Sequence, residues 1–213
     1  MKKQKTWRIL YYCAGLVFLA LGITLNTKTE LGVSPLISIP NCVADLANLN
    51  LGNCIAVYYT FMVIAQIFIK GKNFHFIDFL QAPMSILFTR LINLFNANLD
   101  FSTAPIVIRF ILLILAIICT GIGAALTVDM KLVPNAADGM VGAISDRTGK
   151  DMGLVKNLVD LSAVIITAII GLVFAGKLLC IGVGTICTVL GVGRVVAVFN
   201  HVFKRKICEQ SGL

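Results

Sequence analysis

Two stretches of the chain carry the residues that could hold a ligand. Glu30–Pro40 and Lys131–Val141 each follow an apolar segment and set a small polar residue, Ser34 or Asn135, next to a proline. A helix that begins at such a residue presents free backbone N–H groups and a partial positive charge, which suits an anion or a carboxylate. We therefore expect ligand-binding residues here: Gly32, Ser34, Asn135, Asp138 and Gly139.

Each of these stretches admits two placements. Backbone broken at membrane depth is tolerated only where protein or water satisfies its N–H and C=O groups. Both helix starts could dip inward and meet near the midplane, forming a site. Alternatively, the two short helices lie on the two membrane surfaces and bind nothing. The sequence leaves both placements open.

Charged residues inside apolar segments are the second set of candidates. A charge inside the hydrocarbon costs about 2.5–3.5 kcal/mol on insertion scales. Arg90 and Arg194 lie near segment ends, where long side chains can snorkel to the surface. Asp160 follows Lys156 by four residues, which allows a neutralising helical pair. A structural role is the alternative for all of them, but Arg90, Arg194 and Asp160 are included in the predicted ligand site.

Other chemistry is not indicated. Asp138-Gly139 has a superficial likeness to membrane alcohol phosphatidyltransferases, but the Ala-Arg that those enzymes need is absent. The chain lacks a Gly-x-x-x-x-Gly-Lys-Ser/Thr motif for ATP. Its seven cysteines include no Cys-x-x-Cys, and cysteine in apolar spans behaves as a small hydrophobe. We predict no enzyme, with no catalytic residues, no cofactor and no metal.

The elements that position these residues are membrane helices. Of the 213 residues, 58% are hydrophobic and only 13% are charged, about half the charged fraction of an ordinary soluble domain. A spanning helix needs about 20 mostly apolar residues. Six segments qualify: Ile9–Leu25, Cys54–Ile69, Phe76–Leu94, Ile106–Val128, Val155–Phe174 and Leu178–Phe199.

The distribution of the net charge of +8 is explained by membrane topology rather than by binding to a polyanion. Lysine and arginine gather before the first segment, after the second and at the C-terminal end, whereas the alternate loops are poor in them. This positive-inside pattern predicts that both termini are cytoplasmic. It also explains the basic composition without nucleic acid as a partner.

The chain contains an internal repeat. A shift of 101 residues pairs Gly22 with Gly123 and Asp45 with Asp146, and a further shift of three pairs Arg90 with Arg194. The single membrane domain, residues 1–213, then divides into units 9–100 and 106–203. Three crossings per unit is an odd number, so the second unit is inverted relative to the first, as in many secondary transporters. A duplication without mechanistic meaning is the alternative.

Three motifs carry a family resemblance: Leu21-Gly22, Glu30–Pro35 and Ile181–Thr185. With the duplicated pattern, they resemble the YczE/YyaS/YitT family of bacterial integral membrane proteins over nearly the whole chain. The resemblance implies a polytopic protein of the bacterial plasma membrane and brings no substrate. Leu36 stands where an aromatic residue is expected after Ser-Pro, so a shared ligand contact does not carry over there.

The sequence therefore predicts an all-α polytopic membrane protein with six transmembrane helices, two short broken or re-entrant helices and an inverted internal repeat. The expected function is a small secondary transporter or permease of an unidentified small solute, with an anion as one candidate. The alternative is a non-transporting accessory or partner subunit, including the substrate-capturing subunit of a larger importer. The lipid bilayer is the expected partner, and a homodimer or a partner membrane complex fits equally.

Overall fold

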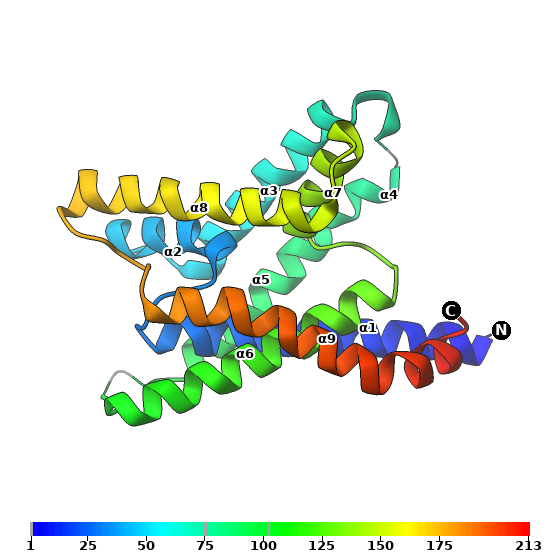
Figure 1. Ribbon diagram of the computed structural model, residues 1–213, viewed down its shortest axis with the longest axis horizontal. Helices are drawn as coiled ribbons and strands as arrows, with labels where there is room; N and C mark the ends of the chain where they lie inside the picture. The colour runs from blue at the N-terminus through cyan, green and yellow to red at the C-terminus, as the bar shows by residue number, and fades with distance from the viewer. Residues whose placement is uncertain (1, 75, 102) are drawn as a thin grey trace. The chain divides into compact units, whose positions relative to one another are not determined.

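The computed structural model describes residues 2–74, 76–101 and 103–213 and consists of helices with no strand among them (Figure 1). Five of these helices are long and apolar enough to cross a membrane: Gln4–Lys28, Leu51–Lys70, Ile106–Asp129, Met152–Ala175 and Val183–Ser211. By helix length and hydropathy the chain is a multi-pass integral membrane protein. It folds as two compact units.

The first unit contains Met1–Gly32, Leu94–Leu132 and Gly182–Leu213. Its helices are α1 (Lys2–Lys28), α6 (Ile106–Asp129) and α9 (Val183–Ser211). A Cβ on Gly22 would lie 2.6 Å from the backbone nitrogen of Thr120, and one on Gly123 would lie 2.5 Å from that of Leu19. These glycines let α1 and α6 pack backbone against backbone, as small residues do in membrane helix pairs.

Polar contacts fix the ends of the first unit. Arg8 donates from Nε and Nη2 to the carbonyl oxygens of Met130 and Lys131, both at 2.7 Å. Lys204 on α9 pairs with Asp129 at 3.0 Å. These bonds satisfy carbonyls and a carboxylate that the C-terminal end of α6 leaves free.

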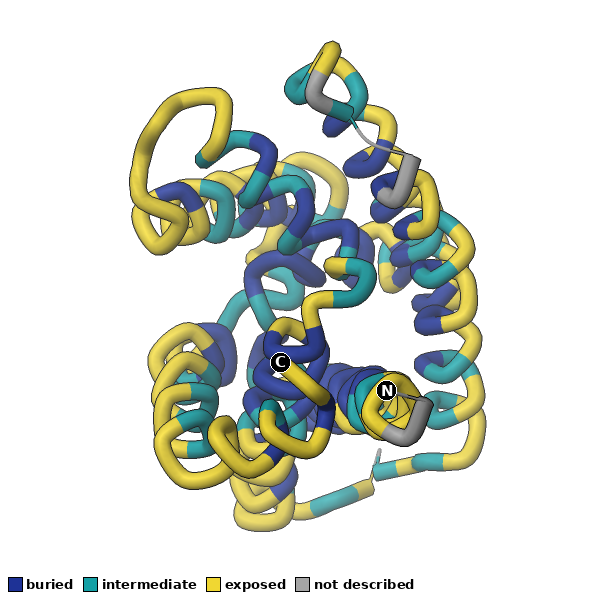
Figure 2. The backbone as a smooth tube through the Cα atoms, turned by 90° about the vertical axis from the view of Figure 1, so that its right-hand side faces the viewer, coloured by how far each residue is buried: buried dark blue, intermediate teal, exposed yellow. Residues whose placement is uncertain are grey.

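The second unit contains Val33–Asn93 and Val133–Ile181. Its helices are α2 (Pro35–Ala47), α3 (Leu51–Lys70), α4 (Phe76–Phe79), most of α5 (Gln81–Asn98), α7 (Ala136–Thr148) and α8 (Met152–Ala175), with a 3₁₀ turn at Gly71–Asn73. The short helices α2 and α7 each pack against both α3 and α8. Figure 2 shows that buried and exposed residues alternate along the helices, so each helix buries one face.

The 101-residue offset relates the backbones of the two halves of the chain. α2 and α7 begin after Ser34 and Asn135 and end before Asn48 and Gly149, both of which have positive φ. The next helices begin after Asn50 and Asp151, whose side chains both accept bonds from the following turn. Each member of these pairs lies 101 residues from its counterpart. The local backbone therefore repeats even where the residue types differ.

Two predicted spans differ from the structure. The chain breaks at Leu80 between α4 and α5, so Phe76–Leu94 is not one helix, and α5 is not among the long apolar helices. Its buried face is largely polar: Gln81, Ser85 and Thr89. The last helix begins at Val183 rather than Leu178, because Cys180 has a positive φ of 62°, which no helix continues.

Candidate functional site

The start of α7 is built by local sequence. Asn135, with φ −59° and ψ 146°, occupies the cap position, and its side chain accepts a bond from the Ala137 nitrogen at 3.4 Å. Asn135 also hydrogen-bonds the Tyr59 hydroxyl on α3. Tyr59 is only 2% exposed, so this bond provides a partner for a buried hydroxyl. The cap therefore links the α7 start to the neighbouring long helix.

A pair of buried amides faces the first turn of α7. Gln66 on α3 and Gln81 on α5 donate to one another at 3.1 Å in both directions, and both are fully buried. Gln66 also donates to the Ala136 carbonyl at 3.1 Å. A Cβ added to Gly139 would lie 2.6–3.0 Å from amide atoms of both side chains. Only glycine leaves room for the amide pair at this place.

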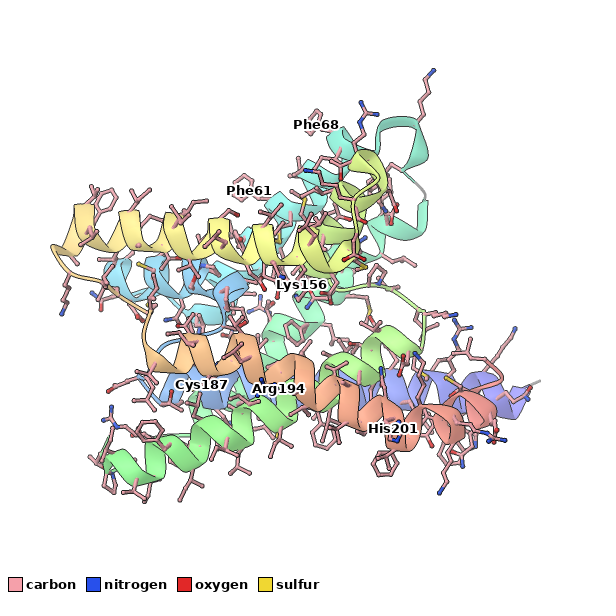
Figure 3. All side chains as sticks on the ribbon, in the orientation of Figure 1. Phe61, Phe68, Lys156, Cys187, Arg194 and His201 are labelled. Atoms are coloured by element: carbon pink, nitrogen blue, oxygen red, sulfur yellow. The ribbon has the colours of Figure 1, made fainter. Side chains whose placement is uncertain are left out.

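Charged groups lie on the other side of the α7 start. Lys156 on α8 pairs with Asp138 at 3.9 Å, and Figure 3 places Lys156 at the α7 end of α8. Burial raises the pKa of the Asp138 carboxyl, and the Lys156 ammonium opposes that rise. Asp160, one turn further along α8, has a buried Oδ1 without a hydrogen-bond partner. The polar groups of four helices, α3, α5, α7 and α8, thus meet at one helix start.

The start of α2 has the same backbone with different side chains. Ser34 occupies the cap position without a side-chain bond. The Ser38 hydroxyl donates to the Pro35 carbonyl at 2.6 Å and lies 2.7 Å from the Thr167 hydroxyl on α8. Ser38 and Thr167 are the 101-residue counterparts of Gly139 and Gln66. A hydroxyl pair between α2 and α8 therefore stands where α7 has a glycine beside an amide of α3.

A third polar cluster joins α2 to the turn that precedes α9. Asn41 donates to Asp45 at 3.3 Å and to the Cys180 sulfur at 3.0 Å, and Cys180 donates to Asp45 at 3.2 Å. Burial and the Asp45 carboxylate raise the pKa of the Cys180 thiol to about 12, against the opposing bond from Asn41. The thiol therefore stays protonated at neutral pH and is a poor nucleophile.

The sequence-predicted site residues fall into two groups. Asn135, Asp138, Gly139 and Asp160 come together around the start of α7, and Ser34 belongs to the same compact unit. Gly32 and Arg194 lie in the first unit. Gly32 has a φ of 109°, and a Cβ there would lie 2.5 Å from the Gly182 nitrogen, so its size and conformation have a packing explanation.

The two arginines lie on exposed helix faces. The guanidinium of Arg90 on α5 has a single 3.4 Å contact with the side-chain oxygen of Asn53. Arg194 lies on the exposed face of α9, as Figure 3 shows. The described contact of Arg90 is therefore not with the polar groups around α7, and Arg194 belongs to the first unit. His75, which lies three residues before Asp78 in the sequence, is outside the described residues.

Sequence reasoning missed three members of the cluster, Tyr59, Gln66 and Gln81. Amides are rare in apolar helices because each unbonded amide group is costly there. A search for Gln and Asn within the long apolar segments would have found Gln66. Among the described residues no group of three or more His, Cys, Asp or Glu side chains could hold a metal ion.

Comparison with known proteins places the chain in one family. A family model that matches residues 6–201 is described as "Family of unknown function (DUF6198)". Neither the curated proteins nor the solved structures gave a match.

Proposed function

The chain belongs to the DUF6198 family of unknown function, and on that premise we propose that it is a small secondary transporter or permease. Its substrate is an unidentified small solute that binds at the start of α7. One observation carries the proposal: the buried polar groups of the second unit converge on that helix start. In a chain that is 58% hydrophobic, so many polar groups at one place call for a function.

The ligand-binding part of the site consists of the Asn135 cap, the first turn of α7 and the Asp138–Lys156 pair. The positive end of the α7 dipole and the Lys156 ammonium favour a carboxylate or another anion. Asp138 favours a cationic group on the same solute. A solute with both charges satisfies both halves of the site, whereas an uncharged solute satisfies neither.

The membrane arrangement that supports transport has six crossings. The 18 residues of α5 extend about 27 Å, close to the hydrocarbon thickness of about 30 Å, so α5 serves as the sixth. The two repeat units are then inverted, and α2 and α7 enter from opposite sides as re-entrant helices. The lysine and arginine distribution puts both termini in the cytoplasm. The resemblance to the YczE/YyaS/YitT family supports a bacterial plasma membrane.

The second candidate is an accessory membrane subunit, and one observation favours it. Arg194 and other polar residues of α9 lie on an exposed face of a helix whose span is 6% buried. A partner membrane protein, or a second copy, would cover such a face. Capture of a solute for a larger importer combines the two functions, because the α7 site then binds without transporting.

Flux through purified protein separates the two candidates. The full chain is reconstituted in liposomes and tested with a panel of labelled small zwitterions and organic anions, with protein-free liposomes as the control. A transporter gives saturable uptake of at least one solute. Binding without uptake, together with a fixed partner that copurifies from the membrane, contradicts transport and supports the accessory function.

Topology provides an independent test. Tags at both termini should be cytoplasmic, and a cysteine that replaces Asp100 should react with an impermeant thiol reagent from outside in a cysteine-free background. A C-terminal tag on the external side removes the inverted repeat and the transport proposal with it.

A further inference from the structure

The charged groups at the α7 start do not balance. Asp138 and Asp160 contribute two carboxyl groups, whereas Lys156 contributes a single ammonium, and electrostatic interactions couple Asp160 to both of the others. With all three ionised the group carries one net negative charge. An unbalanced charge next to apolar helices is unfavourable. A bound cation or a proton removes it.

Lys156 forms its salt bridge with Asp138 rather than with Asp160. The Nζ atom of Lys156 lies 3.9 Å from Asp138 Oδ1, and Asp160 has no salt bridge within 4.0 Å among the described ion pairs. The Oδ1 atom of Asp160 is buried and has no hydrogen-bond donor. A buried carboxylate oxygen without a hydrogen-bond donor is unfavourable, because no protein bond replaces its hydration. Asp160 is therefore the member of the group whose charge is least compensated.

Among the described groups that act electrostatically on Asp160, Lys156 is the cation. From α3, Tyr58 faces Asp160 and Tyr59 faces Asp138, and both are neutral phenols. From α7, Asp138 adds a further negative charge. The carboxylate of α2, Asp45, is bonded to Asn41 and Cys180 instead. The described surroundings of Asp160 thus favour its neutral form.

The three charged groups occur in the second repeat of the chain and not at the matching positions of the first. At the 101-residue offset Asp160 corresponds to Tyr59, Lys156 to Ile55 and Asp138 to Ile37. The fold therefore accepts uncharged residues at all three places. Three charged groups that the fold itself does not need point to a function.

We propose that Asp160 is a reversible proton-binding site, and that its proton is the coupling ion of the transporter. The second clause rests on the proposed function, whereas the first does not. The step is a simple equilibrium in which the Asp160 carboxylate takes one proton from water and later returns it. The net charge of the three groups changes from −1 to 0 on protonation, so acid favours the loaded form.

Carbodiimide labelling tests the proton site without a transport assay. Dicyclohexylcarbodiimide adds to protonated carboxyl groups in apolar surroundings and leaves a stable acylurea that mass spectrometry locates. The full chain in detergent or liposomes should be labelled at Asp160, and the labelling should fall as the pH rises, because the reagent needs the protonated carboxyl group. Asp160→Asn should remove the label, and Asp160→Glu should keep it.

A matched pair of variants checks the electrostatic cause. Lys156→Met removes the cation that favours both carboxylates, so the midpoint of labelling should move to higher pH. Asp138→Asn removes the competing negative charge, so the midpoint should move to lower pH. Size-exclusion profiles identify any variant that fails to fold, and the two opposite shifts cannot both result from loss of fold.

Three results overturn the proton site: labelling of Asp138 in place of Asp160, labelling independent of pH, or protection of Asp160 by sodium at constant pH. The last would make a metal cation the bound ion. If Asp160 titrates as expected but the chain moves no solute in liposomes, the proton site stands and the transport proposal fails. If solute flux in Asp160→Asn is still accompanied by proton movement, proton coupling at this residue fails and transport stands.

Discussion

At the start of α7 a glycine faces two buried amides, whereas at the start of α2 a serine faces a buried threonine. The backbones match at an offset of 101 residues, and the contacted carbonyls, Ala136 and Pro35, match as well. At the α7 start the larger Gln66 on α3 is combined with Gly139, and at the α2 start the smaller Thr167 on α8 is combined with Ser38. The difference shows that the two helix starts are packed by different pairs of side chains. The Asp138–Lys156 ion pair and Asp160 lie at the α7 start.

The comparison also separates structure from function. At the start of each short helix, a side chain donates a hydrogen bond to a backbone carbonyl, Ala136 in α7 and Pro35 in α2. In α2 a hydroxyl pair is enough to provide this bond. The α7 half adds an ion pair and an unbonded carboxylate that the α2 half lacks. Substitutions at matched positions of α2 and α7 can therefore test whether the two helix starts differ in function.

The largest effect is expected for Gly139→Leu. Its side chain would displace the Gln66–Gln81 pair, and overpacking together with the lost amide bonds costs about 3 kcal/mol or more. Gly142→Leu is the matched control, because a Cβ there has nothing within 4 Å. Thermal unfolding should separate the two variants clearly. Equal stability would mean that the amide pair does not pack on Gly139.

The next effect compares the two caps. Asn135→Ala removes a cap worth about 1 kcal/mol and leaves the Tyr59 hydroxyl without a partner, for a total of about 2–3 kcal/mol. Ser34→Ala should cost almost nothing, since Ser34 forms no side-chain cap bond. Denaturation of both variants in the same detergent provides the measurement. A larger loss for Ser34→Ala would invert the comparison.

A smaller difference is expected between Gln66→Leu and Thr167→Val. Gln66 forms three bonds and Thr167 two, and side-chain bonds in membrane proteins average about 0.6 kcal/mol. Expected losses are therefore about 2 and about 1 kcal/mol. Combining Gln66→Leu with Gln81→Leu should recover part of the loss, because no amide then remains unpaired. A strictly additive double variant would argue against the pair.

The smallest effect is expected for Arg90→Lys and Arg194→Lys. Both arginines are exposed, and the only hydrogen bond described for either side chain is the 3.4 Å contact of Arg90 with Asn53. Lysine keeps the charge and snorkels equally well. Stability and ligand response should both stay unchanged. Loss of the response in either variant would return that arginine to the binding site.

The sequence was most informative about local backbone. It predicted the helix starts at Ser34 and Asn135, because capping residues act within a turn. It erred at Phe76–Leu94, where mean hydropathy conceals the polar face of α5 that begins at Gln81. Hydropathy averages a helix and does not report which face is buried.

The tertiary contacts of the site could not be predicted. Gln66 and Gln81 lie on different helices, and nothing in their spacing indicates that they pair. The spacing of Lys156 and Asp160 suggested a helical pair, yet Lys156 bonds Asp138 because α7 packs beside α8. Such partners depend on how helices pack, which one sequence does not encode in any short pattern.

A ligand-stability screen tests the central claim, that the α7 half binds the solute, most directly. Purified protein is heated with each member of a panel of small zwitterions and anions, and hits are repeated with Asp138→Asn and with Ile37→Asn, its counterpart on α2. A solute at 100 times its Kd stabilises by about 2.7 kcal/mol, or roughly 5–10 °C in Tm. We predict that Asp138→Asn abolishes this shift and that Ile37→Asn retains it. A shift that survives Asp138→Asn and disappears in Ile37→Asn would contradict the account.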